Sequence, residues 1–220
     1  MDTIIQILAR ELGRSEAHVE NVVRLIDEGN TIPFIARYRK ELHGAMDDTA
    51  LRTLADRLQY LRNLDKRREE VKSAIEGQGK LTEELSAAID AAATLAEVED
   101  LYRPYKQKRR TRATVAREKG LEPLAELLFA QAADGPAPEE AAGAFVDPEK
   151  GVETAEDALQ GASDIIAERI SDDADIRKRL RELVWKKGYL VSAAAAKEPE
   201  DTVYRLYYAF RSPLNRVQGH

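Results

Sequence analysis

Seven basic side chains fall between residues 103 and 117, an interval without any acidic residue. Because arginine and lysine neutralise phosphate oxygens, such a cluster is typical of a surface that contacts a nucleic-acid backbone. Tyr102 and Tyr105 stand at its start and supply rings on which bases can stack. We therefore select these basic residues as a candidate nucleic-acid-binding site: Arg103, Lys106, Lys108, Arg109, Arg110, Arg112 and Arg117.

The remainder of the chain has the opposite charge. The formal net charge of the 220-residue chain is −6, and residues 134–175 contain 13 acidic residues against Lys150 and Arg169. Two interpretations of the basic cluster follow. Its cations contact phosphates, or they pair with acidic helices of this chain or with a protein partner. The sequence leaves both interpretations open.

The residues around the cluster predict how the chain presents it. Pro104 lacks a backbone donor and disfavours helical geometry at Arg103, so the first cations are expected on a loop. Thr111 or Thr114 can cap a short helix that ends at Gly120. The cluster is therefore expected to run from a loop into the start of a helix.

Composition excludes several kinds of site. The chain has no cysteine and three scattered histidines, so we expect no metal site, and no sequence feature indicates a cofactor. It contains no glycine-rich phosphate loop, HExxH, GxSxG or cysteine nucleophile, so we expect no enzyme. The N-terminal apolar run is broken by Gln6 and Arg10, which argues against a signal peptide or a membrane span. A cytoplasmic location is expected.

Hydrophobic periodicity predicts an all-α fold, a multi-helix bundle with one long central helix. Residues 3–12 and a segment capped by Ser15 form two short helices about Gly13, which is compatible with a helix-turn-helix-like unit or with a plain packing hairpin. Asp47 or Asp48 caps the long helix, residues 49–76, which at 1.5 Å per residue would reach roughly 40 Å. Its inward stripe is Leu51, Leu54, Leu58 and Leu61.

A short helix is predicted after Thr31, because Pro33 suits the first turn. Phe34, Ile35 and Tyr38 would form its apolar side. Its remaining positions carry three cations, which either contact phosphate or simply face solvent: Arg37, Arg39 and Lys40.

A cluster of Asp134, Gly135, Pro136 and Pro138 marks the clearest break in the chain. We predict a helical region with the long helix and basic loop over residues 1–133, a second helical subdomain over 134–192, and a connector to a further domain over 193–220. A helix over 172–187, capped by Ser171, is expected to bury four residues, and residues 189–192 form the one predicted strand. The four expected buried residues are Ile176, Leu180, Leu183 and Val184.

Several long strings of this sequence resemble the N-terminal region of the Tex family of bacterial transcription accessory proteins. They are TIPFIARYRKE at residues 31–41, DLYRPYKQKRRT at 100–111, AREKGLEPLA at 116–125, ASDIIAERI at 162–170 and YYAFRSPLNRV at 207–217. The chain departs from the pattern at Gln107, where a proline is expected, and in its alanine run at 193–196. Neither departure removes a basic position from the loop.

The resemblance implies a multidomain protein. Such proteins join a helical N-terminal part with a helix-turn-helix-like unit to an RNase H-like domain, helix-hairpin-helix elements and an OB-fold RNA-binding domain, which is the expected main nucleic-acid contact. It implies a cytoplasmic, non-enzymatic factor that binds DNA or RNA, weakly in this part alone, and that associates with the transcription machinery. The alternative is a purely structural interaction module whose basic loop pairs with an acidic surface.

Overall fold

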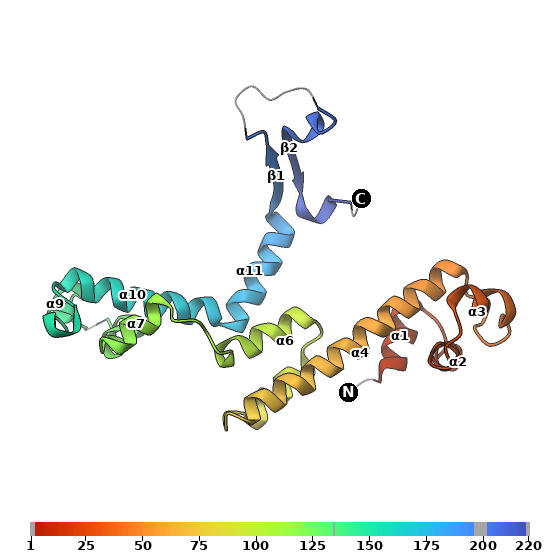
Figure 1. Cartoon of the computed structure of the whole chain (residues 1–220), viewed down its shortest axis with the longest axis horizontal. Coiled ribbons are helices and arrows are strands. Elements are labelled where there is room, and N and C mark those ends of the chain that lie inside the picture. Colours follow the sequence, from red (N-terminus) through yellow and green to blue (C-terminus); the bar gives the residue numbers. More distant parts are fainter. Residues whose placement is uncertain (1–2, 134, 196–201, 219–220) are drawn as a thin grey trace. The chain divides into compact units, whose positions relative to one another are not determined.

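The computed structural model describes residues 3–133, 135–195 and 202–218. Within them the chain is predominantly helical and forms one two-stranded sheet (Figure 1), which confirms the predicted all-α class. Contacts divide it into two compact units, Met1–Tyr102 and Arg103–His220. The division predicted after residues 133 and 192 stays a prediction. None of the described helices is both long and apolar enough to cross a membrane.

The first unit contains six helices within its described residues. Side chains of Thr3, Ser15, Asp47 and Thr82 accept hydrogen bonds from backbone N–H groups at the helix starts, which confirms the caps predicted at Ser15 and Asp47. The helices are α1 (Ile4–Leu12), α2 (Glu16–Asp27), α3 (Ile32–Tyr38), α4 (Asp48–Glu76), α5 (Glu83–Ala91) and α6 (Leu95–Tyr102).

The long helix α4 carries the core of the first unit. Its predicted stripe, Leu51, Leu54, Leu58 and Leu61, is buried against residues of α1, α2 and α3, and the stripe continues through Leu64, Val71 and Ile75. Helices α1 and α2 pack beside one another, as the predicted pair requires. A helix-turn-helix role for them stays a prediction.

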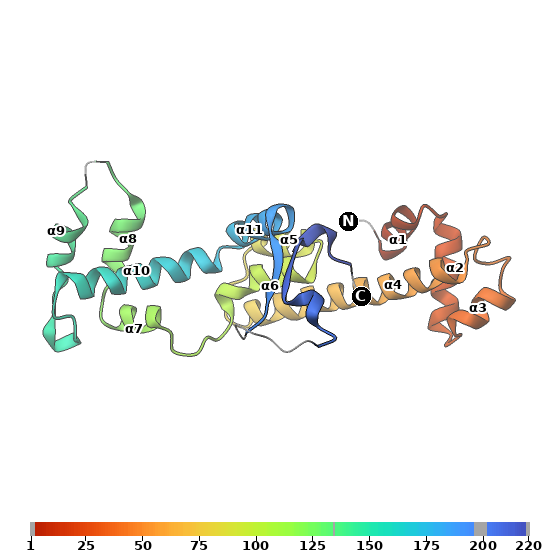
Figure 2. The ribbon, with the colours of Figure 1, turned by 90° about the horizontal axis from the view of Figure 1, so that it is seen from above.

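The second unit is built around α10 (Ala155–Asp172). Figure 2 shows α7 (Arg112–Glu118), α8 (Glu122–Ala130) and α9 (Pro138–Gly143) arranged along it, and all three contact it. Helix α11 (Ala174–Lys187) follows α10 and contacts it. Four 3-10 turns and a two-stranded hairpin complete the described part of this unit: η1 (Arg103–Tyr105), η2 (Pro148–Lys150), β1 (Tyr189–Ala193), η3 (Arg205–Tyr207), β2 (Ala209–Pro213) and η4 (Leu214–Arg216).

Helices α7 and α10 approach closely because small residues line both. Ala113 and Ala116 of α7 and Ala158 and Ala162 of α10 are buried in one cluster. A Cβ atom added at Gly161 would lie 2.3 Å from Leu121 Cδ1 and 3.3 Å from Ala116 Cβ. A larger side chain at this position would therefore require Leu121 to shift and would press against Ala116 of α7.

Two predictions about α11 are wrong. Helix α10 continues past Ser171 to Asp172, and the carboxylate of Asp173, not Ser171, caps α11 by accepting a hydrogen bond from the Ile176 N–H at 2.8 Å. Three of the four residues expected to be buried are exposed, since Leu180, Leu183 and Val184 keep 53%, 49% and 51% of their surface, while Ile176 is half-buried. These residues are apolar at helical spacing, but the described residues cover that side of α11 only in part, through Leu214 of η4, which lines a hollow with Leu180 and Val184.

The predicted strand at residues 189–192 is confirmed, but it does not stand alone. β1 pairs antiparallel with β2, with Val191 opposite Arg211 and Tyr189 opposite Pro213. Sequence reasoning missed β2 because its residues lie in a stretch dense in aromatic side chains without clear alternation. The pairing anchors this part of the chain, although Val203, Tyr204 and Leu206 before it are 87%, 67% and 80% exposed.

The buried stripe of α4 can be tested at Leu58, which is 2% exposed. Leu58→Asp places a carboxylate among apolar side chains and should lower the free energy of unfolding by about 3 kcal/mol or more. Gln59→Asp, at the exposed neighbouring position, should cost only about 0.5 kcal/mol through helix propensity. Urea denaturation followed by circular dichroism measures both, and equal midpoints for the two variants would show that the stripe is not a core.

Candidate nucleic-acid interface

Three carboxylates form a row along α10 beside the basic cluster. Asp164, Glu168 and Asp172 follow one another at intervals of four residues, so they share one helix face. Their side chains are only 14%, 15% and 13% exposed. Carboxylates covered to this degree require cationic or hydrogen-bonding partners, and the basic cluster supplies them.

The cluster residues pair with this row from one end to the other. Arg103 Nε lies 2.8 Å from Asp172 Oδ1, and the ammonium group of Lys108 contacts both Asp172 and Glu168. Arg117 Nη1 donates to Glu168 Oε2 at 2.7 Å, and Arg112 Nη2 lies 3.4 Å from Asp164 Oδ1. The loop is thus fixed along α10 by ion pairs.

Glu168 is the centre of this row. Its second oxygen accepts a hydrogen bond from Thr111 Oγ1 at 3.0 Å, and the same threonine hydroxyl caps α7 by accepting from the Thr114 N–H at 3.1 Å. Burial favours the protonated carboxyl, but hydrogen bonds from Arg117 and Thr111 together with the charge of Lys108 outweigh it and lower the pKa of Glu168. The predicted cap at Thr111 is confirmed. Through this one hydroxyl group, the start of α7 is connected to the carboxylate row of α10.

The seven cluster residues differ in how far their side chains are exposed and in their ion pairs. The side chains of Lys108, Arg117 and Arg103 are 29%, 35% and 44% exposed and lie against the carboxylate row. Arg110, paired with Glu118 at 2.6 Å, is 68% exposed, and Arg112 is 85% exposed. Lys106 and Arg109 are exposed, and Arg109 forms no ion pair with any residue that the structure describes.

Neither the tyrosines nor the adjoining hollow forms an obvious anion site. Tyr102 and Tyr105 are only partly exposed, and the Tyr102 ring already faces the Arg67 guanidinium at 5.5 Å. A hollow of about 610 Å³ beside the loop is lined by carboxylates as well as cations. Its charged lining consists of Lys106, Lys108, Arg117, Arg169, Glu122, Glu126, Glu168, Asp172 and Asp173.

Comparison with known proteins identifies the family. A model described as the Tex-like protein N-terminal domain matches residues 2–76, and one described as Tex central region-like matches residues 134–220. The chain belongs to the Tex family. This confirms the resemblance noted in the sequence.

Individual relatives of this Tex-family chain match it along nearly its whole length. It is 47% identical to protein tex of Bordetella pertussis over 99% of the chain and 27% of that protein. It is 41% identical to the transcriptional accessory protein Tex of Neisseria gonorrhoeae over 99% of the chain and 28% of that protein. It is 30% identical to the human S1 RNA-binding domain-containing protein 1 over 99% of the chain and 22% of that protein. The chain thus spans less than a third of each relative.

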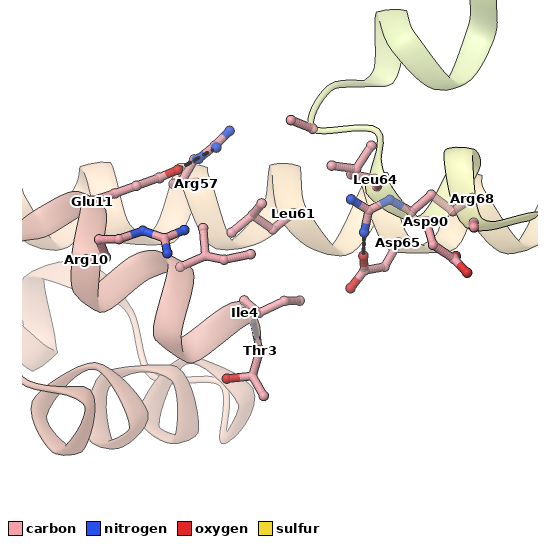
Figure 3. A pocket seen from close by; sticks show the side chains of 14 residues that line it. Thr3, Ile4, Arg10, Glu11, Arg57, Leu61, Leu64, Asp65, Arg68 and Asp90 are labelled. Atoms are coloured by element: carbon pink, nitrogen blue, oxygen red, sulfur yellow. Dashed lines mark hydrogen bonds and ion pairs between the residues drawn. The ribbon is translucent and has the colours of Figure 1, made fainter. Parts of the chain in front are cut away.

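A second hollow, of about 800 Å³, lies in the first unit of the Tex-family chain (Figure 3). Residues of α1, α4 and α5 line it, including Ile4, Leu61 and Leu64. The charged groups there neutralise one another, since Arg57 donates to Glu11 at 2.7 Å and Arg68 to Asp65 at 2.5 Å. The carboxylates of Glu11 and Asp65 at this hollow are therefore engaged by arginines, and within the described residues neither is paired with a second carboxyl group or a histidine that could serve in general acid–base catalysis.

Sequence reasoning selected the cations and offered their pairing with acidic helices of this chain as one alternative, but it did not single out the carboxylates that hold them. The local signal was present, because residues 164, 168 and 172 repeat at the helical interval of four within the acidic block. What the sequence could not provide was the pairing across about fifty to seventy positions, for example Arg117 with Glu168 or Arg103 with Asp172. That pairing depends on how α7 packs on α10.

Glu168→Gln tests the row. Loss of the charged partner of Arg117 and Lys108 should lower the free energy of unfolding by about 1–2 kcal/mol at pH 7. Because the folded-state pKa is lowered, the contribution of Glu168 is present above its unfolded pKa of about 4.3 and is lost as pH falls through the folded value. The difference between parent and variant should therefore shrink on acidification.

Glu156→Gln is the matched control, since Glu156 is an exposed residue of the same helix. It should change the free energy of unfolding by about 0.5 kcal/mol or less. Denaturant titrations at several pH values measure both variants. A Glu168→Gln effect that is no larger than the control, or that does not depend on pH, would contradict the role given to Glu168.

Proposed function

We propose that this chain is part of a cytoplasmic, non-catalytic transcription accessory factor that binds nucleic acid and works with the transcription machinery. Support comes from the family and from the printed names of relatives, of which one is a transcriptional accessory protein and a more distant one is an S1 RNA-binding domain-containing protein. In this proposal the helical units hold the nucleic-acid-binding surfaces and position the remainder of the protein.

The seven cluster residues divide into two roles in the proposal. Arg103, Lys108 and Arg117 contact the carboxylates of α10 and hold the loop in place. Lys106, Arg109, Arg110 and Arg112 extend into solvent and contact phosphates.

The observation that carries this division is the exposure of Arg112. Its side chain is 85% exposed, and its Nη2 lies 3.4 Å from Asp164. A phosphate group can therefore approach the exposed side of the guanidinium while Asp164 remains its partner. Lys108, Arg117 and Arg103 are less exposed and face Glu168 and Asp172, so a phosphate would have to displace those covered carboxylates.

A second candidate function is purely structural, and the ion pairs favour it. Five of the seven cations, Arg103, Lys108, Arg110, Arg112 and Arg117, pair with five carboxylates, which leaves less positive charge for a phosphate backbone. These carboxylates are Glu118, Glu122, Asp164, Glu168 and Asp172. If this function holds, the loop joins α7 to α10 and does not contact nucleic acid.

Two triple variants separate the candidates. Arg109→Gln, Arg110→Gln and Arg112→Gln together should weaken binding to a mixed-sequence DNA or RNA. The negative slope of log affinity against log salt should become shallower by about 2–3, because three phosphate contacts are lost. The melting temperature should fall less than in a Lys108→Gln, Arg117→Gln variant, since the side chains of Arg110 and Arg112 are 68% and 85% exposed. Fluorescence anisotropy across a salt series measures binding.

The control triple, Arg14→Gln, Lys66→Gln and Lys80→Gln, removes the same charge from exposed positions of the first unit and should leave the slope near that of the parent. Lys108→Gln with Arg117→Gln should instead lower the melting temperature. Parent-like binding by the loop triple would favour the structural candidate. A parent chain that does not bind at low salt would overturn nucleic-acid binding by this part of the protein.

A further inference from the structure

The end of α3 carries cations that have no acidic partner. Arg37, Arg39 and Lys40 form no ion pair with any residue in the described ranges. In contrast, arginines along the neighbouring α4 are paired, such as Arg57 with Glu11 at 2.7 Å and Arg62 with Asp27 at 2.7 Å. The positive charge at α3 is therefore not neutralised by contacts of the kind that hold the basic loop.

Two aromatic rings stand between these cations. The rings of Phe34 and Tyr38, one turn apart on α3, have centroids 5.2 Å apart at 47°. The Arg39 guanidinium lies 5.4 Å from the Phe34 centroid, and that of Arg37 lies 6.0 Å from the Tyr38 centroid. Unlike Tyr102, which is only partly exposed, Tyr38 still keeps 56% of its surface exposed. The sequence predicted that Tyr38 lies on the apolar side of this helix. Only Ile35 is fully buried there, so the exposed tyrosine needs another explanation.

The chain after α3 is held in place. His43 is 1% exposed, and Gly44, at φ +59°, lies so close to His18 that an added Cβ would be 2.3 Å from its ring. Asn21 of α2 donates to the Leu42 carbonyl at 3.3 Å and accepts from Arg24 at 3.1 Å, which brings a further exposed cation to this segment. A fixed backbone reduces the conformational entropy that a ligand must overcome on binding.

We propose that Arg37, Tyr38, Arg39 and Lys40 form a binding site for single-stranded nucleic acid. A base stacks on the exposed Tyr38 ring, and the neighbouring phosphates contact the three cations. The inference rests on the proposed function for the class of ligand, but it places the contact in a different unit from the basic loop.

Chemistry favours a single strand over other anionic partners. Duplex bases are stacked on one another and cannot present a face to Tyr38, whereas an unpaired base can. An acidic peptide would satisfy the cations but would leave the ring without a stacking partner. The segment 31–46 contains one acidic residue, Glu41, so its own charge is +2 with His43 neutral.

Tyr38→Ala tests the stacking contact in the intact chain. The variant should weaken binding to a 12-nucleotide single-stranded DNA or RNA by about 5- to 100-fold, the range expected when one stacked base is lost. Tyr204→Ala, at a tyrosine that is 67% exposed in the second unit, is the matched control and should bind like the parent. Equal melting temperatures of the two variants exclude unfolding as the cause.

Arg37→Gln with Lys40→Gln tests the phosphate contacts. In the double variant the negative slope of log affinity against log salt should become shallower by about 1.4, the value for two contacts to a single strand. Arg14→Gln with Lys80→Gln removes the same charge elsewhere in this unit and should leave the slope unchanged. The DNA duplex of the same sequence should lose nothing through Tyr38→Ala.

A fluorescence signal reports stacking directly. In Tyr38→Trp with Trp185→Phe, the indole at position 38 is the only one in the chain, and stacking of a base should quench it on titration with the single strand. Quenching by a poly-glutamate peptide but not by the single strand would replace the proposal with an acidic-peptide site.

The outcomes separate this site from the loop. Parent-like single-strand binding by both α3 variants, with binding lost in the loop triple, would overturn the α3 site and leave the proposed function standing. Binding lost in the α3 variants but kept in the loop triple would support the α3 site and remove the loop. A parent chain without any binding to single strands would overturn both.

Discussion

The close contact between α7 and α10 is the constraint on which the second unit depends. Gly161 of α10 lies close to Ala116 of α7, since an added Cβ would be 3.3 Å from the alanine Cβ, so the two helices meet through glycine and alanine surfaces. This packing holds Thr111 within 3.0 Å of Glu168 while the same hydroxyl caps α7. The packing of α7 on α10 therefore brings the cations of the loop to the carboxylates of α10.

Local sequence rules were sufficient wherever a structure depends on neighbouring residues. The caps at Ser15, Asp47 and Thr111 and the stripe through Leu58 follow from side chains within one or two turns, and the structure has them. The rules failed where burial depends on distant elements. Helix α11 has an apolar pattern at Leu180, but a pattern does not supply the element that would cover it.

The candidate site shows the same limit in electrostatic terms. A basic run in a sequence says how many cations lie close together and nothing about the carboxylates that reach them. Arg117 and Glu168 are 51 positions apart in the sequence, yet Arg117 donates a hydrogen bond to Glu168 at 2.7 Å. The charge of this arginine is therefore already paired within the protein. The number of cations in the run therefore overstates the charge that it offers to a phosphate backbone.

Availability of charge, then, is set by the acidic residues that folding brings near and not by local cation density. The interval 103–117 holds seven cations, and α10 presents Glu168 and Asp172 to them. The end of α3 holds only three, but no carboxylate within the described residues pairs with Arg37 or Lys40, and Tyr38 remains exposed between them. The smaller cluster therefore combines cations without a described acidic partner with an exposed ring, a combination that the basic loop does not offer.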